Sequence, residues 1–114
     1  MDRADFETAL EEFRATAEAA HLAYFARNDF TFAVPSIKIA ERRGTRYVKL
    51  WNHETRNETG ESRCNSIHSF VEIATGDILK PEGTKKPAKH ARGNIYEDAG
   101  RASLTDTGSI RYMK

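Results

Sequence analysis

The sequence has little of several features that mark whole classes of proteins. It contains one cysteine, Cys64, so an internal disulfide bond is excluded and a reducing compartment such as the cytoplasm is expected. No apolar run approaches the ~20 residues that a helix needs to cross a bilayer, so no membrane partner is expected. The acidic N-terminus lacks the apolar region of a signal peptide, which argues against secretion.

Cofactor, metal and catalytic motifs are also missing. The glycines form no Walker or Rossmann fingerprint, and the histidines and Cys64 have none of the spacings typical of metal ligands. A lone cysteine at the start of a strand is more often a small buried residue than a nucleophile. The sequence therefore predicts no cofactor, no metal site and no catalytic triad.

The composition that remains is typical of one small globular domain. The 114 residues are 39 % hydrophobic and 31 % charged, with a formal net charge of +1. That length allows one buried core but not two, so residues 1–114 are predicted to form a single domain.

Residues 5–27 are predicted to form one long helix, because apolar side chains recur there at steps of three and four residues. The stripe consists of Phe6, Leu10, Phe13, Ala17, Ala20 and Tyr24. Charged side chains occupy the rest of the helix surface. The aromatic residues of the stripe are therefore expected to belong to the core.

After the helix the period changes to two, which indicates strands. Strands are expected at 32–39, 45–51, 64–73 and 78–80, with an exposed loop at 52–61, and Pro35 predicts a bulge or an edge position in the first of them. In the third strand, Ile67 and Val71 are expected on one face and His68 and Phe70 on the other. The expected fold is α+β, an N-terminal amphipathic helix packed on an antiparallel sheet of four to five strands.

The C-terminal segment 109–113 is expected to add a strand or to mediate self-association. One helix can leave a sheet face incompletely covered, so a homodimer is an open alternative.

Positive charge is concentrated between residues 80 and 92, where five cations stand against one acid, Glu82. A local field of this kind attracts anions, which points to a phosphate-bearing partner. Pro87 and Gly93 suit the start and the end of a short basic helix of about 1.5 turns near 87–93. A solvated surface helix is an equally good interpretation of the same segment.

The candidate ligand-binding residues come from this segment and from two aromatic positions. Asn94 and Tyr96 offer an amide and a ring for a base, and Trp51 offers a second ring. The full candidate set is Lys85, Lys86, Lys89, His90, Arg92, Asn94, Tyr96 and Trp51.

The hairpin before Trp51 is also basic, through Arg42, Arg43, Arg46 and Lys49. These cations fit a second wall of the anion site or a solvated edge hairpin. For Arg42 and Arg43 the solvated hairpin is favoured.

A pattern in small, largely uncharacterised bacteriophage proteins is similar to three consecutive runs of this sequence, which are Ser66-Ile67-His68-Ser69-Phe70-Val71, Thr75-Gly76-Asp77-Ile78-Leu79-Lys80 and Lys86-Pro87-Ala88-Lys89-His90-Ala91-Arg92-Gly93-Asn94-Ile95. The resemblance covers residues 66–96 and implies a phage origin, hence the cytoplasm of an infected bacterial host. It implies no activity and no catalytic residue.

Three functions remain open. The first is a non-enzymatic phage accessory protein that binds a phosphate-containing ligand, with sequestration of a nucleotide immune signal of the host as its role. The second is a single-stranded nucleic-acid-binding module, since a pI near 7.9 argues against a broad duplex-binding face. The third is a protein inhibitor that docks its basic patch on a host enzyme.

A phosphodiesterase is the enzymatic alternative, ranked below simple binding. His90 beside Lys89 and Arg92 is placed to act as an acid or base, and His68 or Glu72 would have to be its partner.

Overall fold

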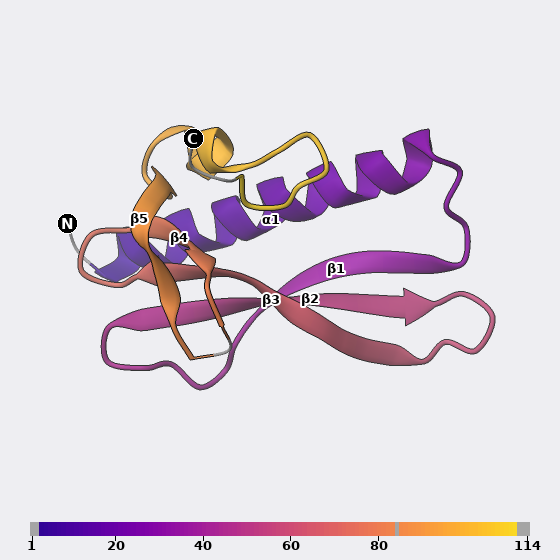
Figure 1. The fold of residues 1–114 in the computed structure, drawn as a ribbon, viewed down its shortest axis with the longest axis horizontal. Helices are drawn as coiled ribbons and strands as arrows, with labels where there is room; N and C mark the ends of the chain where they lie inside the picture. Colours follow the sequence, from indigo (N-terminus) through magenta and orange to yellow (C-terminus); the bar gives the residue numbers. More distant parts are fainter. Residues whose placement is uncertain (1–2, 84, 112–114) are drawn as a thin grey trace.

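The computed structural model describes residues 3–83 and 85–111 and confirms the α+β prediction. A helix α1 (Arg3–Arg27) precedes five strands and a short 3₁₀ segment η1 (Asp98–Ser103). The strands are β1 (Ala33–Ile39), β2 (Tyr47–Arg56), β3 (Ser62–Glu72), β4 (Asp77–Pro81) and β5 (Pro87–Asn94). They form one antiparallel sheet in the order β1-β2-β3-β4-β5, and α1 lies along one face of it (Figure 1).

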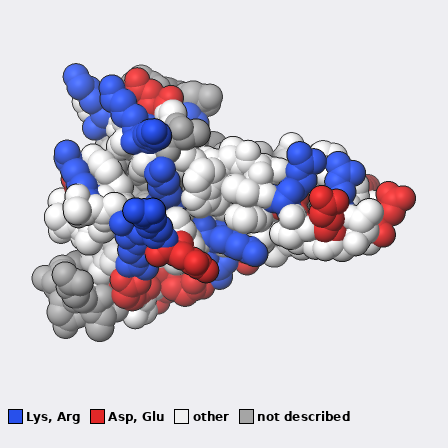
Figure 2. All heavy atoms as spheres, turned by 90° about the horizontal axis from the view of Figure 1, so that it is seen from below, with Lys and Arg blue, Asp and Glu red and all other residues white. Residues whose placement is uncertain are grey.

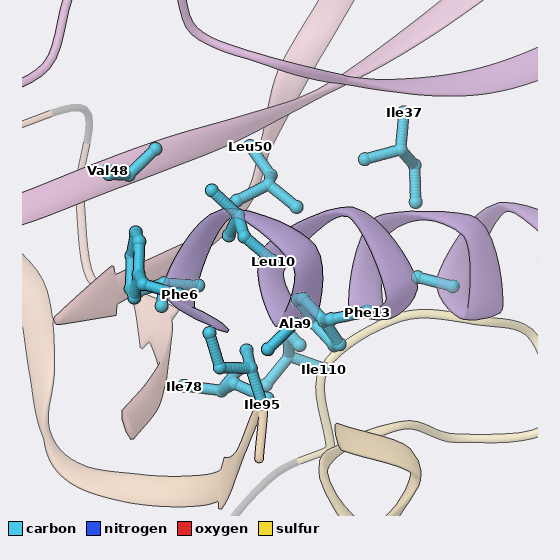
Figure 3. Close-up of a cluster of buried hydrophobic side chains, with 12 residues drawn as sticks. Phe6, Ala9, Leu10, Phe13, Ile37, Val48, Leu50, Ile78, Ile95 and Ile110 are labelled. Carbon is cyan, nitrogen blue, oxygen red and sulfur yellow. The ribbon is translucent and has the colours of Figure 1, made fainter. Parts of the chain in front are cut away.

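The core lies between α1 and the sheet (Figure 3). Leu10, Phe13 and Ala17 from the predicted helical stripe are fully buried. They meet apolar side chains of the sheet and of the C-terminal segment, namely Ile37, Val48, Leu50, Val71, Ile78, Ile95 and Ile110. The helix prediction and the assignment of Phe6 and Phe13 to the core are therefore confirmed, whereas Tyr24 is half-buried and outside the core.

Strand β1 lies at an edge of the sheet and is protected there. Its pairing with β2 runs without a shift, so Pro35 marks an edge position and not a bulge. The N–H of Ile37 donates to Glu18 Oε1 (2.9 Å) and its carbonyl accepts from Arg14 Nη1 (3.1 Å), both on α1. Pro35, two residues earlier on the same side of the strand, has no N–H to offer. The middle of this edge is thus protected from pairing with a further strand.

The predicted loop at 52–61 is wrong in its first half, because β2 continues to Arg56. This part of β2 is paired with β1 on one side and β3 on the other. Two backbone ladders hold it as a strand although it lacks aliphatic side chains, so the connection shrinks to residues 57–61.

The predicted faces of β3 are also wrong, because a β-bulge changes the alternation. Leu50 pairs with Ser69 and Trp51 pairs with Ile67, so His68 is an extra residue between them. His68 is buried on the α1 side, whereas Phe70 lies opposite Lys49 on the far face.

The predicted short helix near 87–93 is wrong, because Pro87–Asn94 is strand β5. A helix of about 1.5 turns gains too few hydrogen bonds to offset its nucleation cost. The free edge of β4 supplies partners for the same backbone, although the pairing shifts between Ile78 and Leu79 and again before Pro81.

The C-terminal segment covers the core and forms only one isolated bridge, Leu104 with Ile110. The predicted strand at 109–113 is thus reduced to that bridge within the described residues, and positions 112 and 113 lie outside them.

Candidate functional site: a basic, aromatic face of the sheet

The face of the sheet opposite α1 carries alternate residues of β2. Val48 and Leu50 point into the core, so Tyr47, Lys49 and Trp51 lie on the opposite face. Figure 2 shows this face, with most of its Lys and Arg side chains on the left half of the molecule and acidic side chains at the upper and lower borders of that half. The left half holds the β1–β2 loop and the β4–β5 turn (Figure 1).

The first hollow, of about 590 Å³, lies between these two connections. Its cations are Arg42, Arg43, Arg46, Lys49 and Lys85, and its aromatic residues are Tyr47, Trp51 and Phe70. Ala40, Gly44 and Thr45 complete the lining, which contains no acidic residue.

The second hollow, of about 440 Å³, adjoins the first because Arg46 and Tyr47 line both. Its other lining residues are Glu72, Asp77, Leu79, Lys86, Pro87, Ala88, Lys89 and Ala91. It is therefore built across β4 and β5, next to the first hollow on β2.

Two of the cations are held in ion pairs. Arg43 Nη1 lies 2.6 Å from Glu7 Oε2, and Arg46 Nε lies 2.7 Å from Glu72 Oε2. The hydrogen bond that each arginine donates to its carboxylate holds the pKa of the arginine above the usual value. The same bond from Arg46, together with one from Thr75, lowers the pKa of Glu72.

The remaining cations of the two hollows have no ion-pair partner among residues 3–83 and 85–111. They are Arg42, Lys49, Lys85, Lys86 and Lys89. The linings of the two hollows thus hold more cations than acids, which are Glu72 and Asp77, and this excess favours an anionic partner.

The rings of the first hollow are in contact with cations. Lys49 Nζ lies 6.0 Å from the centroid of Trp51 and 5.8 Å from that of Phe70, near the limit for a cation–π contact. The guanidinium of Arg46 lies 5.1 Å from the centroid of Tyr47. Phe70 is buried, while Tyr47 and Trp51 are half-buried and keep part of their surface accessible.

The structure divides the predicted ligand-binding residues into two groups. Trp51 and Lys85 line the first hollow, and Lys86 and Lys89 line the second. The other four predicted residues, His90, Arg92, Asn94 and Tyr96, line neither.

The side chain of Asn94 is occupied within the fold. Its Nδ2 donates to the carbonyl of Thr75 (2.9 Å) and to Asp77 Oδ1 (3.0 Å), and its Oδ1 accepts from the N–H of Tyr96 (2.9 Å). Gly76, at the same turn, has a φ of +80°, and a Cβ there would lie 2.6 Å from the ring of Tyr96. Asn94 and Tyr96 therefore fasten the β3–β4 turn to the end of β5.

Arg92 is likewise engaged. It is half-buried, and its guanidinium donates to the carbonyl of Arg111 (3.3 Å) and to that of His90. These bonds tie β5 to the C-terminal segment, while the side chain of His90 is exposed.

Sequence reasoning identified the basic hairpin but missed Tyr47 and Phe70. The alternation of Tyr47, Lys49 and Trp51 around buried Val48 was the available signal for Tyr47. Phe70 had no such signal, because the bulge at His68 changes its face. The structure also brings Arg42, for which solvation was favoured, to the lining of the first hollow.

The histidines do not form an acid–base site around His90. The Nε2–H of His68 donates to the carbonyl of Gly108 (2.7 Å), so its Nδ1 accepts from the hydroxyl of Ser69 (3.0 Å). Burial lowers the pKa of His68 to about 4, and His68 lies on the α1 face, away from the two hollows. Glu72 is paired with Arg46.

Within the described ranges, no cluster of three His, Cys, Asp or Glu side chains has the arrangement of a metal site. None of the helices in those ranges has the length and hydropathy of a membrane span.

Comparison with known proteins identifies a family and no function. Neither a curated protein nor a solved structure matches the chain significantly. Residues 8–113 match a family of unknown function, and the chain with its basic, aromatic sheet face thus belongs to DUF7717.

Proposed function

We propose that this protein binds a phosphate-bearing ligand, a nucleotide in the first instance, in the first hollow and without turning it over. The observation that carries the proposal is the lining of that hollow, which combines five cations and three aromatic rings with no acid. Cations supply charge-assisted hydrogen bonds to phosphate oxygens, and half-buried rings supply a stacking surface for a base.

The cations differ in the roles that they offer. Arg42 and Lys85 are exposed and without an ion-pair partner in the described part of the chain, so a ligand phosphate meets them without breaking another bond. Lys49 lies beside Trp51, which places a positive charge next to the ring. An anion in this hollow meets cations from the β1–β2 loop, from β2 and from the β4–β5 turn.

The biological role that we attach to this binding is that of a phage accessory protein that sequesters a nucleotide immune signal of the host. The resemblance of residues 66–96 to bacteriophage proteins supports the origin. The cations and rings that line the first hollow suit the phosphate and the base of a nucleotide. Capture without turnover is favoured over a phosphodiesterase because His90 lies outside both hollows and His68 is buried with both ring nitrogens hydrogen-bonded.

Calorimetric titration with adenosine 5′-monophosphate, and with adenosine as its phosphate-free counterpart, tests the proposal. The nucleotide is expected to bind and the nucleoside to bind at least about tenfold more weakly, since a charge-assisted hydrogen bond contributes about 1.5–3 kcal/mol. Chromatography of the mixture after incubation is expected to return the nucleotide unchanged.

Arg42→Gln is the informative variant and Arg63→Gln its matched control. Both arginines are exposed, but Arg63 lies at the start of β3, outside the first hollow. Arg42→Gln is expected to weaken nucleotide binding by about tenfold, as expected for loss of one such bond, and Arg63→Gln to leave it unchanged. Equal effects of the two substitutions, or no binding of the nucleotide, would refute the proposal; the second result would favour a protein partner for the basic face.

A further inference from the structure

The two hollows adjoin, because Arg46 and Tyr47 line both of them. We infer that the ligand is a phosphodiester-linked oligonucleotide of at least two nucleotides, which lies unpaired across both hollows with Arg46 between its phosphates. The inference rests on the proposed function and names the class of ligand.

Arg46 is well placed for this role. Its side chain is 69 % exposed, and its Nε is bound to Glu72, which leaves the two Nη groups of the guanidinium for a ligand. A planar guanidinium offers hydrogen-bond donors in several directions, so one arginine can contact consecutive phosphates. Tyr47, against which the guanidinium packs at 5.1 Å, is accessible from the same two sides.

The second hollow supplies its own cations, Lys86 and Lys89, both exposed and without an ion-pair partner in the described ranges. It also contains two acids, which are already engaged. Glu72 accepts from Arg46 and Thr75, and Asp77 accepts from Asn94. Arg46 neutralises Glu72, so the two exposed lysines outnumber Asp77, the acid of this lining that is in no ion pair of the described residues.

The apolar surface follows the same path. Trp51 lies in the first hollow, Tyr47 in both, and Pro87 with Leu79 in the second. Bases of a single strand stack on half-buried rings such as Trp51 and Tyr47 without regard to sequence, which a paired base inside a duplex cannot do. The pI near 7.9, which is less basic than that of typical duplex-binding domains, also favours a short groove over an extended duplex-binding surface.

The inference is tested by ligand length. Deoxyadenosine monophosphate and deoxyadenylates of two and four nucleotides are titrated against the wild-type protein and two variants. The affinity is expected to rise by at least about tenfold from the monomer to the four-nucleotide strand, the gain of one further charge-assisted contact.

Lys89→Gln is expected to remove most of that gain and to leave the monomer unaffected, because Lys89 lines only the second hollow. It is also expected to reduce the salt dependence of strand binding by about 0.7 in the slope of log K against log salt. Arg42→Gln, in the first hollow, is expected to weaken every ligand of the series. A comparison of cyclic di-AMP with the linear dinucleotide shows which of the two fits the site better. If either one binds more tightly than the monomer, that result supports a ligand that spans both hollows.

Two results would overturn the inference. The first is a monomer that binds as tightly as the four-nucleotide strand, and the second is a Lys89→Gln variant that weakens monomer and strand by the same factor. Either leaves the proposed function standing, whereas a failure of all these ligands to bind would end both.

Discussion

The two halves of the segment from Lys85 to Tyr96 are used differently. In the first half Lys85, Lys86 and Lys89 are exposed and line the two hollows. In the second half Asn94 and Tyr96 bind the β3–β4 turn. The sequence pattern that joins the Thr75-Gly76-Asp77 turn to the end of β5 is thus explained by contacts within the fold, and only the lysine-rich half is left to explain by a ligand.

The largest expected loss of stability comes from a substitution in the core, against which the effects of substitutions in the two halves of the segment can be compared. Phe13 is fully buried beside Leu10 and Ile78, so Phe13→Ala is expected to lower the free energy of unfolding by about 3–5 kcal/mol through the cavity that it leaves. Urea denaturation followed by circular dichroism measures the change. A midpoint equal to that of the wild type would show that the core lies elsewhere.

The second effect depends on pH and arises from His68. Because its pKa is about 4 in the fold and near 6.5 in the unfolded chain, the unfolded state binds more protons between these values. Stability is therefore complete above about pH 6.5 and falls as the pH is lowered toward 4, by up to about 1.4 kcal/mol per pH unit. His21, whose pKa burial also lowers, adds to the loss in the same direction.

Thermal unfolding between pH 7 and pH 4 measures this dependence, with His68→Gln as the comparison. The variant is expected to be less stable at pH 7. Its stability is also expected to depend less steeply on pH, because the buried titrating group is gone. The same dependence of stability on pH in both proteins would contradict the assignment of this effect to His68.

Asn94→Ala tests the second half of the segment directly. The substitution removes both donors and the acceptor that hold the turn, and leaves Asp77 and the N–H of Tyr96 without these partners. The expected loss is about 1–3 kcal/mol in the free energy of unfolding, with nucleotide affinity unchanged in the folded protein. A variant of normal stability that no longer binds the nucleotide would place the amide in the binding site.

Lys85→Gln is the matched test of the first half and has the smallest effect on stability. Since the side chain is exposed and outside any ion pair of the described chain, the free energy of unfolding is expected to stay within about 0.5 kcal/mol of the wild type. Nucleotide binding is expected to weaken. A large loss of stability would mean that this lysine also supports the fold.

Much of the fold could be predicted from local patterns. The stripe of α1 and the two-residue period of β1 and β2 locate these elements because each buries one face. Strand β5 could not be found this way, since Pro87–Asn94 lacks the alternation of a half-buried strand and is held by backbone pairing with β4. The bulge at His68 depends on long-range register, which no local pattern encodes.

The sequence predicted the kinds of residue that form the candidate site, but not how they are arranged in space. Charge clustering identified Lys85 and Lys89, and the basic hairpin was seen as an alternative wall. That Arg42, Lys49 and Lys85 line the same hollow follows from the way the β1–β2 loop and the β4–β5 turn meet over the sheet. Such a meeting of distant segments requires the tertiary structure.

Backbone amide shifts of ¹⁵N-labelled protein, recorded during titration with adenosine 5′-monophosphate, test the central claim most directly. Saturable shifts are expected to concentrate in the β1–β2 loop, in the first half of β2 and at Lys85, with residues 57–61 at the opposite end of the sheet unaffected. Shifts confined to the α1 face, or none at all, would contradict the claim that the basic, aromatic face is the binding site.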